Sequence, residues 1–388
     1  MRKLAIAAAA AAALAAGGVH AQTRGVTDTE VRVGGAHDMS GIFAGFSVPA
    51  VKAAQLYFDE VNAKGGVHGR QIRYIVEDHG YQVPKAVQAV NKLVNRDEVF
   101  AMLLSLGTPH NIAAFNVLDP LGIPNISPLT AARQMLQDPI ENKFTGLSSY
   151  YDGIRAAAGY LMEKNGRKTI CSMYIPSDFG EEIHSATVDE AQARGLTFKA
   201  ETQHRPDETD FTGAIGKLKA EGCDLVSIAL GLRATITAVG TAKKMGWTDA
   251  DFLVSSAGFH TAVAKVPGGV TEGLYAGAGW QDLEARLSNP AVADWVAKWK
   301  AATGEDLPGT GALLGRTAAE VFVRALEAAG PDLTLDSFKQ AMNTLKYEEE
   351  IGGYTVDYTD GSHVGSSDIY ISQVQNGSWA LIGEVQAD

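Results

Sequence analysis

The sequence is poor in the residues that usually carry metal or covalent chemistry. It contains two cysteines among 388 residues. Cys171 and Cys223 both lie beside apolar, β-branched runs, so each is interpreted most simply as a small buried hydrophobic residue, with a disulfide in an oxidising compartment as the alternative. No two histidines stand four residues apart, which favours isolated histidines over a metal site.

Sequence motifs of common enzymes are also missing. The glycines of Gly34-Gly35 do not fit the dinucleotide pattern G-x-G-x-x-G, and no Walker motif occurs. Ser105 is not flanked as in the hydrolase pattern G-x-S-x-G. The acidic segment from Asp357 to Gly361 lacks the calcium-loop pattern and predicts a hairpin turn instead. We therefore expect no catalytic residue, no metal and no cofactor.

Long apolar runs are missing after the first 21 residues. No later stretch approaches the roughly 18 uninterrupted apolar residues that a membrane span needs, so no second anchor is predicted. The formal net charge is −12, and acidic and basic residues are spread evenly along the chain. No basic face for nucleic acid or anionic lipid is expected.

The N-terminus has the pattern of a secretory signal peptide. Arg2 and Lys3 are basic, Leu4 to Ala16 is apolar, and Val19-His20-Ala21 ends in small residues at the cleavage positions. Cleavage is expected after Ala21. Residue 22 is Gln and not the Cys that a lipid-anchored product would need, so the exported chain is expected to carry no lipid.

The remainder of the chain alternates short β-branched runs with amphipathic helices, a pattern typical of parallel sheets covered by helices on both faces. Its length predicts about two domains. Strands are expected at 31–34, 71–76, 100–104 and 123–126, and the same order restarts after Gly146 with strands at 169–174, 196–201, 224–230, 252–255 and 273–277. The predicted fold class is therefore α/β with two duplicated halves.

The last third adds elements to both halves. The first helix is expected from Pro49 to Ala63, and a long helical region from Pro290 to Ala329 follows the second sheet. The tail alternates apolar and polar residues around Asp360-Gly361 and Asn376-Gly377, and both pairs predict hairpins. Elements placed after both sheets imply that the chain crosses back between the halves.

The loops that follow the strands are the candidate binding site, because open α/β sheets bind ligands at the carboxyl ends of their strands. Hydroxyls and glycines concentrate in the first half, and aromatic residues occur in both, which suits a small ligand with an anionic head and an apolar body. The candidate contacts are Phe46, Ser105, Gly107, Thr108, Leu129, Thr130, Tyr150, Tyr151, Phe179, Arg233 and Phe259.

Five segments carry a family resemblance: Gly25 to Glu30, Met39-Ser40-Gly41, Asn62 to Arg70, Ser105 to Pro109 and Asp178-Phe179-Gly180. In these segments, and in element order from about residue 26 to the end, the chain resembles the Leu/Ile/Val-binding family of periplasmic substrate-binding proteins of ABC importers. The run from Asn62 to Arg70 with its flanking motifs is specific for the family but not for a ligand.

The resemblance implies a type I periplasmic binding fold, in which two Rossmann-like lobes joined by three crossings close on a ligand. Lobe 1 is expected to hold residues 26–146 and 283–353, and lobe 2 residues 147–282 and 354–385. The resemblance also implies a monomer in the periplasm that delivers its ligand to an ABC permease in the inner membrane.

The same resemblance assigns roles to several candidates. Hydroxyls and amides of lobe 1 hold a ligand carboxylate in the family, and the matching positions are Gly107, Thr108 and the loop Leu129-Thr130. The aromatic residue that matches the first-loop contact is Phe46. Lobe 2 wall positions fall at Tyr151, Phe179 and near Gly231-Leu232.

The loop after the strand at 252–255 departs from the family pattern. Amino-acid binders place an acidic residue there to meet the ligand ammonium, but this chain reads Ala257-Gly258-Phe259-His260. Burying an ammonium without a partner costs several kcal/mol. The expected ligand is therefore a carboxylate with an apolar or aromatic body.

Two alternatives stay open. A branched-chain or other amino acid, or a short amide, is the expected ligand if Asp178, Glu181 or Asp282 reaches the site and restores amine recognition. From a different class, a secreted α/β enzyme would assemble its site from scattered residues such as His37, His110 and Asp178.

Overall fold

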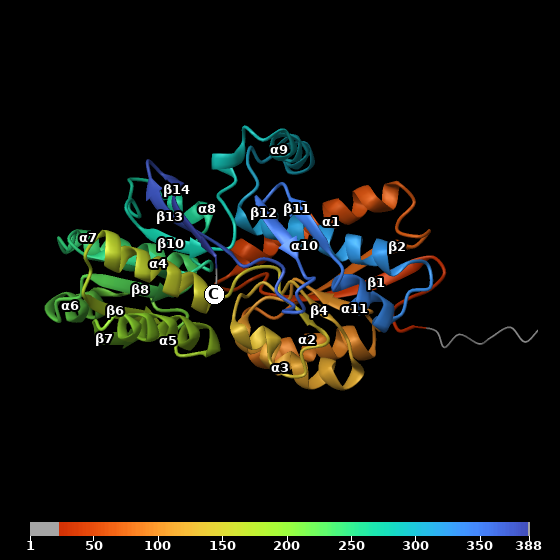
Figure 1. Ribbon diagram of the computed structural model, residues 1–388, viewed down its shortest axis with the longest axis horizontal. Coiled ribbons are helices and arrows are strands. Elements are labelled where there is room, and N and C mark those ends of the chain that lie inside the picture. The colour runs from red at the N-terminus through yellow and green to blue at the C-terminus, as the bar shows by residue number, and fades with distance from the viewer. Residues whose placement is uncertain (1–22, 387–388) are drawn as a thin grey trace, which may run out of the picture.

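The computed structural model describes residues 23–386, so the expected signal peptide lies outside the described residues. Two sheets with their helices form two lobes that lie side by side (Figure 1). We call the lobe built on the first sheet lobe 1 and the lobe built on the second sheet lobe 2. The predicted α/β class with two parallel-sheet lobes is confirmed.

Lobe 1 contains a parallel sheet of five strands in the spatial order β2, β1, β3, β4, β5. These strands are β1 (Glu30–His37), β2 (Gln71–Asp78), β3 (Ala101–Leu103), β4 (Asn125–Ile126) and β5 (Lys143–Phe144). A separate antiparallel pair, β11 (Lys346–Glu349) and β12 (Tyr354–Asp357), lies beside it.

Helices cover both faces of this sheet, as the alternation of its side chains requires. Val33 and Leu103 point into the larger core with α1, α10 and α11, whereas Ala36 and Met102 point into a smaller core with α2 and α3. The helices of lobe 1 are α1 (Ala44–Ala63), α2 (Val83–Asn95), α3 (Thr108–Leu118), α10 (Thr310–Ala329) and α11 (Leu335–Met342), with the short turns η1 (Asp119–Leu121) and η2 (Arg133–Leu136).

Lobe 2 contains a sheet of seven strands in the order β14, β13, β10, β9, β8, β6, β7. Its parallel strands are β6 (Thr169–Tyr174), β7 (Thr197–Gln203), β8 (Leu225–Ala229), β9 (Asp251–Val254) and β10 (Tyr275–Ala278). The strands β13 (Asp368–Gln375) and β14 (Ser378–Gln386) extend it as an antiparallel hairpin. Its helices are α4 (Tyr150–Lys164), α5 (Asp178–Ala193), α6 (Thr212–Ala220), α7 (Leu232–Lys244) and α8 (Thr261–Ala264).

The chain passes between the lobes three times, after β5, after β10 and after β12. The second passage leads through η3 (Glu284–Arg286) to α9 (Pro290–Thr303). The first and third passages run alongside each other, because the N–H of Thr145 donates to the carbonyl of His363 at 2.9 Å and the N–H of Gly365 donates to that of Thr145 at 2.8 Å. The hydroxyl of Tyr358 also donates to the Thr145 carbonyl, at 2.9 Å.

Three local expectations need correction. Helix α1 begins at Ala44 rather than at Pro49, so the proline lies inside the helix. The helical region from 290 to 329 is two helices, because Gly304 takes a left-handed conformation and ends α9. The expected hairpin at Asp360-Gly361 is wrong, since β12 pairs with β11 and the chain then crosses to lobe 2. The hairpin at Asn376-Gly377 is confirmed between β13 and β14.

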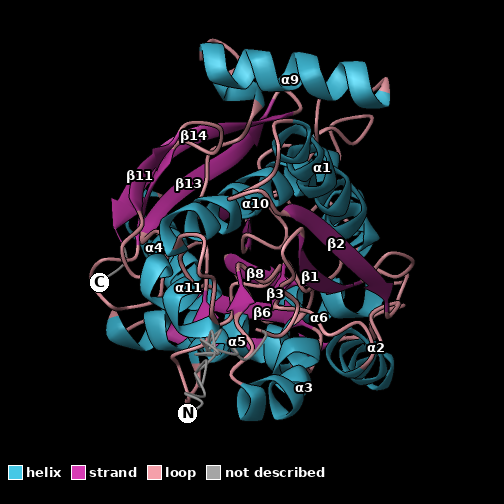
Figure 2. Ribbon diagram, turned by 90° about the vertical axis from the view of Figure 1, so that its right-hand side faces the viewer, coloured by secondary structure: helices cyan, strands magenta, loops and turns pink. Residues whose placement is uncertain are grey.

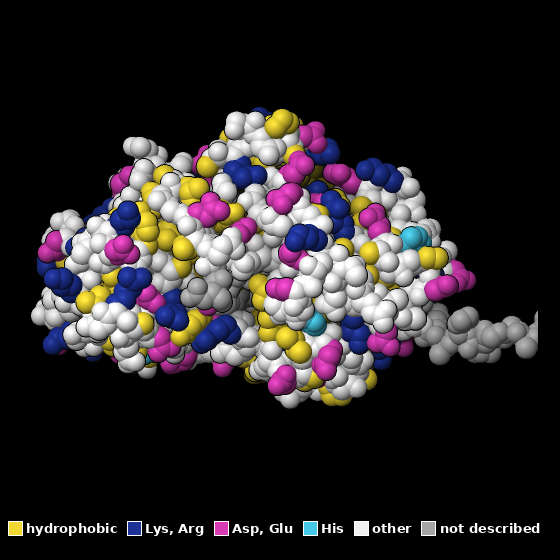
Figure 3. All heavy atoms as spheres, in the orientation of Figure 1, with side chains coloured by type: hydrophobic (Ala, Val, Ile, Leu, Met, Phe, Trp, Pro, Cys, Tyr) yellow, Lys and Arg dark blue, Asp and Glu magenta, His cyan; other side chains and the backbone are white. Residues whose placement is uncertain are grey.

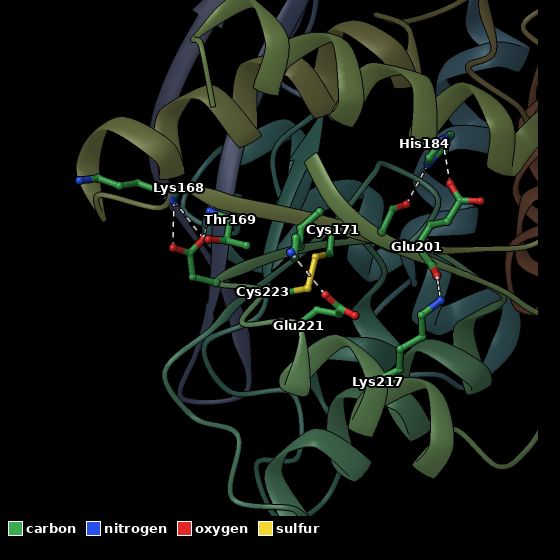
Figure 4. Close-up of a disulfide and its surroundings, with 11 residues drawn as sticks. Lys168, Thr169, Cys171, His184, Glu201, Lys217, Glu221 and Cys223 are labelled. Carbon is green, nitrogen blue, oxygen red and sulfur yellow. Dashed lines mark hydrogen bonds and ion pairs between the residues drawn. A yellow bond between two sulfur atoms is a disulfide. The ribbon is translucent and has the colours of Figure 1, made fainter. Parts of the chain in front are cut away.

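The two cysteines form a disulfide in lobe 2, so the simpler expectation of unpaired cysteines is wrong. Cys171 lies in β6 and Cys223 lies just before β8, with their Cα atoms 5.9 Å apart and a sequence separation of 52 (Figure 4). The two strands are neighbours in the sheet. Asp224, just before β8, also holds the start of β6, because its carboxylate accepts the backbone N–H of Lys168 and of Thr169.

The surface shows no continuous field of one charge on the face drawn in Figure 3, where acidic and basic side chains are interspersed over both lobes. Within residues 23–386, no helix is long and apolar enough to cross a membrane.

Candidate ligand-binding site

A cavity lies where the two lobes meet, at the carboxyl ends of β3, β4 and β5. Both lobes contribute to its lining. The lining residues are Phe43, Phe46, Tyr81, Leu104, Leu106, Gly107, Thr108, Ser127, Pro128, Leu129, Thr130, Ala131, Thr145, Gly146, Leu147, Tyr150, Phe179, Ser256, Ala257, Trp280, Leu314, Thr317, Ala318, Val321 and Tyr354.

Two threonine hydroxyls in the lining of the cavity form a pair. The Oγ1 atoms of Thr108 and Thr130 lie 2.6 Å apart, and both residues are buried. Tyr150 belongs to the same group, because its hydroxyl interacts with Thr130. Burial raises the pKa of Tyr150 to about 12, so the phenol stays protonated at neutral pH and can act as a donor.

Local backbone geometry places Thr108 at this position. β3 ends at Leu103, and Gly107 then adopts a φ of 101°, a left-handed conformation that glycine tolerates best. A Cβ atom on Gly107 would lie 2.3 Å from Nδ1 of His110, so the turn has no room for a larger residue. Thr108 is the first residue of α3, and the positive end of that helix dipole therefore lies beside the paired hydroxyls.

Aromatic rings from both lobes form part of the cavity wall. Phe43 packs edge-on against Phe179 with ring centroids 5.8 Å apart, and Tyr150 packs against Phe179 at 5.5 Å. Tyr81 also packs against Phe43, with ring centroids 4.9 Å apart. These rings come from both lobes, so the wall is complete only when the lobes are together.

The lining is uncharged. Among the described residues that line the cavity there is no Asp, Glu, Lys, Arg or His. Asp178, Glu181 and Asp282, the acids considered as partners for a ligand amine, are not in the lining. Asp282 is buried elsewhere, and its Oδ1 accepts the N–H of Glu284 at 2.9 Å.

Glu182 is a buried acid near the site, but it already has partners. Both of its carboxylate oxygens accept the backbone N–H of Arg133, at 2.9 and 3.0 Å. Burial raises the pKa of Glu182 to about 7, against the effect of these hydrogen bonds. Because Glu182 lies in α5 and Arg133 in η2, this contact joins lobe 2 to lobe 1.

Seven of the eleven residues predicted from sequence meet at the cavity: Phe46, Gly107, Thr108, Leu129, Thr130, Tyr150 and Phe179. The other four lie elsewhere. Ser105 is buried behind the lining, where its Oγ accepts the N–H of Ala36, and Phe259 packs in the lobe 2 core against Trp280 and Trp379. Tyr151 faces outward, where its hydroxyl donates to Asp189 at 2.6 Å, and Arg233 is exposed in the first turn of α7.

Helix α10 supplies part of the cavity wall that the sequence did not predict. Leu314, Thr317, Ala318 and Val321 line the cavity, as does Tyr354 of β12. The apolar spacing of this helix was visible in the sequence, but the same spacing is typical of a helix that faces a filled core. No signal in the sequence separates these two cases.

The residues considered for an enzyme do not meet at the cavity. His37 is fully buried and its Nε2 pairs with the Tyr74 hydroxyl at 2.7 Å, while His110 stacks on His79 with ring centroids 4.5 Å apart. Asp178 begins α5. Burial lowers the pKa of His37 to about 3 and that of His110 to about 4.

Comparison with known proteins gives a consistent picture. A family model described as periplasmic binding protein matches residues 30–378. Two curated relatives are an amino acid binding protein of Pseudomonas aeruginosa, 23% identical over 53% of this chain and 54% of that protein, and the Leu/Ile/Val-binding protein of Escherichia coli K12, 28% identical over 51% and 53%. The chain therefore spans about half the length of these relatives.

Similar solved structures cover nearly the whole chain. A fatty acid ABC transporter substrate-binding protein from Thermomonospora curvata matches with a TM-score of 0.85 and 23% identity over 95% of both chains. A branched chain amino acid ABC transporter protein from Thermus thermophilus with bound valine matches with a TM-score of 0.82 and 18% identity, over 92% of this chain and 97% of that one. At these identities the likeness concerns the fold.

Proposed function

The chain belongs to the periplasmic binding protein family, and we propose that it is the substrate-binding component of an ABC importer for a carboxylate with an apolar body. The observation that carries this proposal is the uncharged cavity with its paired Thr108 and Thr130 hydroxyls at the N-terminus of α3. The seven predicted residues that line the cavity are the proposed contacts.

The head of the ligand is assigned from the donors. The N-terminus of a helix favours an anion, because its first N–H groups and its dipole both point toward it. Threonine and tyrosine hydroxyls add donors without adding a charge. Thr108, Thr130 and Tyr150 therefore support a carboxylate beside the threonine pair.

The uncharged body of the ligand is inferred from the absence of Asp and Glu among the described residues of the lining. An α-ammonium group buried in this cavity would have no carboxylate partner in the lining, and Glu182 is already bonded to Arg133. Leaving a buried charge unpaired costs several kcal/mol, which corresponds to about a hundredfold or more in affinity. An uncharged body avoids this cost.

The names of the relatives do not decide between these ligands. One similar structure is named for fatty acids and another contains valine, and both share the fold to a similar degree. The chemistry of this chain's own lining is therefore the better guide, and it favours the acid.

The closing motion is proposed from the placement of the lining. Of the proposed head-group donors, Thr108 and Thr130 lie on lobe 1 and Tyr150 lies on lobe 2, as does Phe179 of the aromatic wall, so the proposed site is complete only when the lobes meet. The proposed boundaries of the moving units are 146/147 and 282/283. The third boundary is placed after Asp357 rather than at 353/354, because β12 pairs with β11.

The cellular setting is part of the same proposal. Export by the leader, cleavage after Ala21 and release as a lipid-free monomer would bring the protein to a permease in the inner membrane. Mass spectrometry of the exported protein checks this, with Gln22 expected as the first residue. An acylated product or an intact leader would contradict it.

Calorimetry with matched ligand pairs tests the ligand class. Each pair consists of a monocarboxylic acid and its α-amino counterpart, for example 4-methylpentanoate and leucine, or 3-phenylpropanoate and phenylalanine. We expect the acids to bind near micromolar, about −8 kcal/mol, and the amino acids about a hundredfold more weakly.

The amide of each acid separates the remaining alternatives. Tighter binding of the amino acid across several pairs would indicate that the protein binds amino acids for uptake. Tighter binding of the amide would argue against a charged head group. Recovery of each ligand unchanged after prolonged incubation is expected for a receptor, whereas a new product would indicate an enzyme.

A further inference from the structure

The lining of the cavity includes one face of α10 as well as the threonine pair. Leu314, Thr317, Ala318 and Val321 follow the spacing i, i+3, i+4, i+7, so they form one stripe of the helix, and all four line the cavity. The neighbouring stripe, with Phe322 and Ala325, is fully buried in the core of lobe 1. Helix α10 therefore presents one face to the core and the next to the cavity.

Two glycines hold α10 close to α1, beside which it runs (Figure 2). A Cβ atom on Gly311 would lie 2.3 Å from the carbonyl oxygen of Phe46, and one on Gly315 would lie 2.0 Å from that of Ala50. The two backbones thus touch directly. This contact fixes the position of α10 relative to α1, so the part of the cavity wall on α10 cannot shift without disturbing the packing of α10 on α1.

Leu104 and Tyr354 also line the cavity. The few polar atoms here are satisfied by protein partners. The hydroxyl of Thr317 donates to the carbonyl of Leu314 at 3.2 Å, and Tyr354 interacts with Thr317. This part of the lining therefore offers apolar surface rather than free donors or acceptors.

We propose that the space bounded by Leu104, Leu314, Ala318, Val321 and Tyr354 is a compartment for a hydrocarbon chain, so that the ligand is an extended monocarboxylate whose tail lies under α10. The inference rests on the proposed function, because it needs the carboxylate at Thr108 and Thr130 to direct the tail. It goes beyond that function by assigning an extended shape to the apolar body of the ligand and by naming the residues that limit its chain length.

A series of straight-chain monocarboxylates from four to fourteen carbons tests the compartment. Each methylene moved from water into an apolar site contributes about 0.8 kcal/mol, so affinity should rise about fourfold per added carbon. The rise should stop when the compartment is full. Isothermal titration of the whole exported protein, freed of copurified ligand by unfolding and refolding, gives this profile.

Two substitutions on α10 move the limit in opposite directions. Ala318→Leu fills part of the compartment, so the limit should fall by several carbons while the shortest acids bind as in the wild type. Leu314→Ala enlarges the compartment and should raise the limit. Ala328→Leu is the matched control, since Ala328 is exposed on the same helix and the profile should not change.

The outcomes distinguish a failure of the hydrocarbon compartment from a failure of the proposed carboxylate binding. Acids that bind with the same affinity at every chain length, or a limit that neither α10 variant moves, would overturn the compartment and leave carboxylate binding intact. Binding of no acid at any length would overturn both. If Ala318→Leu fails to fold, as thermal unfolding would show, the Leu314→Ala profile still decides the question.

Discussion

The Nε2 atom of His260 in lobe 2 lies 3.2 Å from the carbonyl oxygen of Gly45 in lobe 1. This carbonyl lacks its usual partner within α1, because the residue four positions later is Pro49, which has no N–H. Nδ1 of His260 accepts the N–H of Ala262, so the proton is on Nε2 and the ring donates to Gly45. The proline inside α1 thus leaves an acceptor that the other lobe uses.

Breaking this contact should weaken ligand binding without altering the cavity. His260→Asn keeps a cap for α8 but cannot reach Gly45, and Pro49→Ala supplies an N–H within α1 that competes for the same carbonyl. Each change should lower affinity about five- to tenfold, the value of one neutral hydrogen bond. Calorimetry with the tightest-binding acid measures this.

The double variant provides the control. If the two residues act through one contact, the double variant should bind no more weakly than the weaker single variant. Losses that multiply would show that the residues act independently, and the contact would then have no role in closure.

Replacing Thr130 with valine should lower the affinity for a carboxylate about ten- to a hundredfold. Valine keeps the shape but removes the hydroxyl that pairs with Thr108, and a hydrogen bond to a charged group contributes about 1.5 to 3 kcal/mol. Thr237→Val is the control, because Thr237 lies on α7 away from the cavity. Full affinity in both Thr130→Val and Thr108→Val would contradict the assignment of the head group.

Acid should destabilise the fold through His37. Burial, with His79 as a second contribution, lowers the pKa of His37 to about 3 from an ordinary value near 6.5. The unfolded chain therefore takes up the proton first, so the stability that the neutral ring contributes is complete above about pH 6.5 and is lost as the pH falls toward 3.

Urea unfolding at pH 7 and pH 5 measures this contribution. The difference in unfolding free energy between the wild type and His37→Gln should shrink by about 2 kcal/mol from pH 7 to pH 5. His68→Gln, at an exposed histidine, should show no such change. An equal pH dependence in the wild type and His37→Gln would count against a neutral, buried His37.

Removal of the disulfide should lower stability but not affinity. Cys171 and Cys223 close a loop with a sequence separation of 52, and a crosslink of that span stabilises by about 2 to 4 kcal/mol. We expect the variant Cys171→Ala with Cys223→Ala to lose this amount in urea unfolding while keeping its affinity, since neither cysteine lines the cavity. Free thiols detected in the wild type exported protein would contradict the pairing.

Gly315→Ala should destabilise the chain by about 1 to 3 kcal/mol, because the added Cβ would lie 2.0 Å from the carbonyl oxygen of Ala50. Gly213→Ala is the matched control in α6, where a Cβ meets nothing within 4 Å, and it should stabilise by about 0.4 to 1 kcal/mol. Thermal unfolding compares the two. A stabilising Gly315→Ala would show that α1 and α10 are not in backbone contact.

Much of the fold was predictable because its strands have strong local signals. β6, for example, begins and ends where the β-branched run predicted, at Thr169 and Tyr174. Thr108 and Thr130 were found by the rule that parallel strands end at one edge, which is a property of topology and not of distance along the chain. Arg233 satisfied the same rule but is exposed, since the rule does not fix the direction of a side chain.

The remainder depended on tertiary contacts. Cys171 and Cys223 pair because β6 and β8 are neighbours, although β7 lies between them in sequence. Ala318 and Phe322 belong to similar apolar stripes, yet one lines the cavity and the other the core. α1 begins before Pro49 because its first turns contact α10 and His260, the residue before α8, and the local sequence does not encode these contacts.

The backbone contact that Gly315 makes with α1 also bears on the order of events in binding. It makes the α10 wall part of lobe 1, which already holds Thr108 and Thr130, so the threonine pair and the proposed tail surface both lie on one lobe. Lobe 2 then adds Phe179 and the His260 contact. The association rate should therefore be a property of lobe 1, and the residence time a property of the lobe 2 contacts that must open before the ligand leaves.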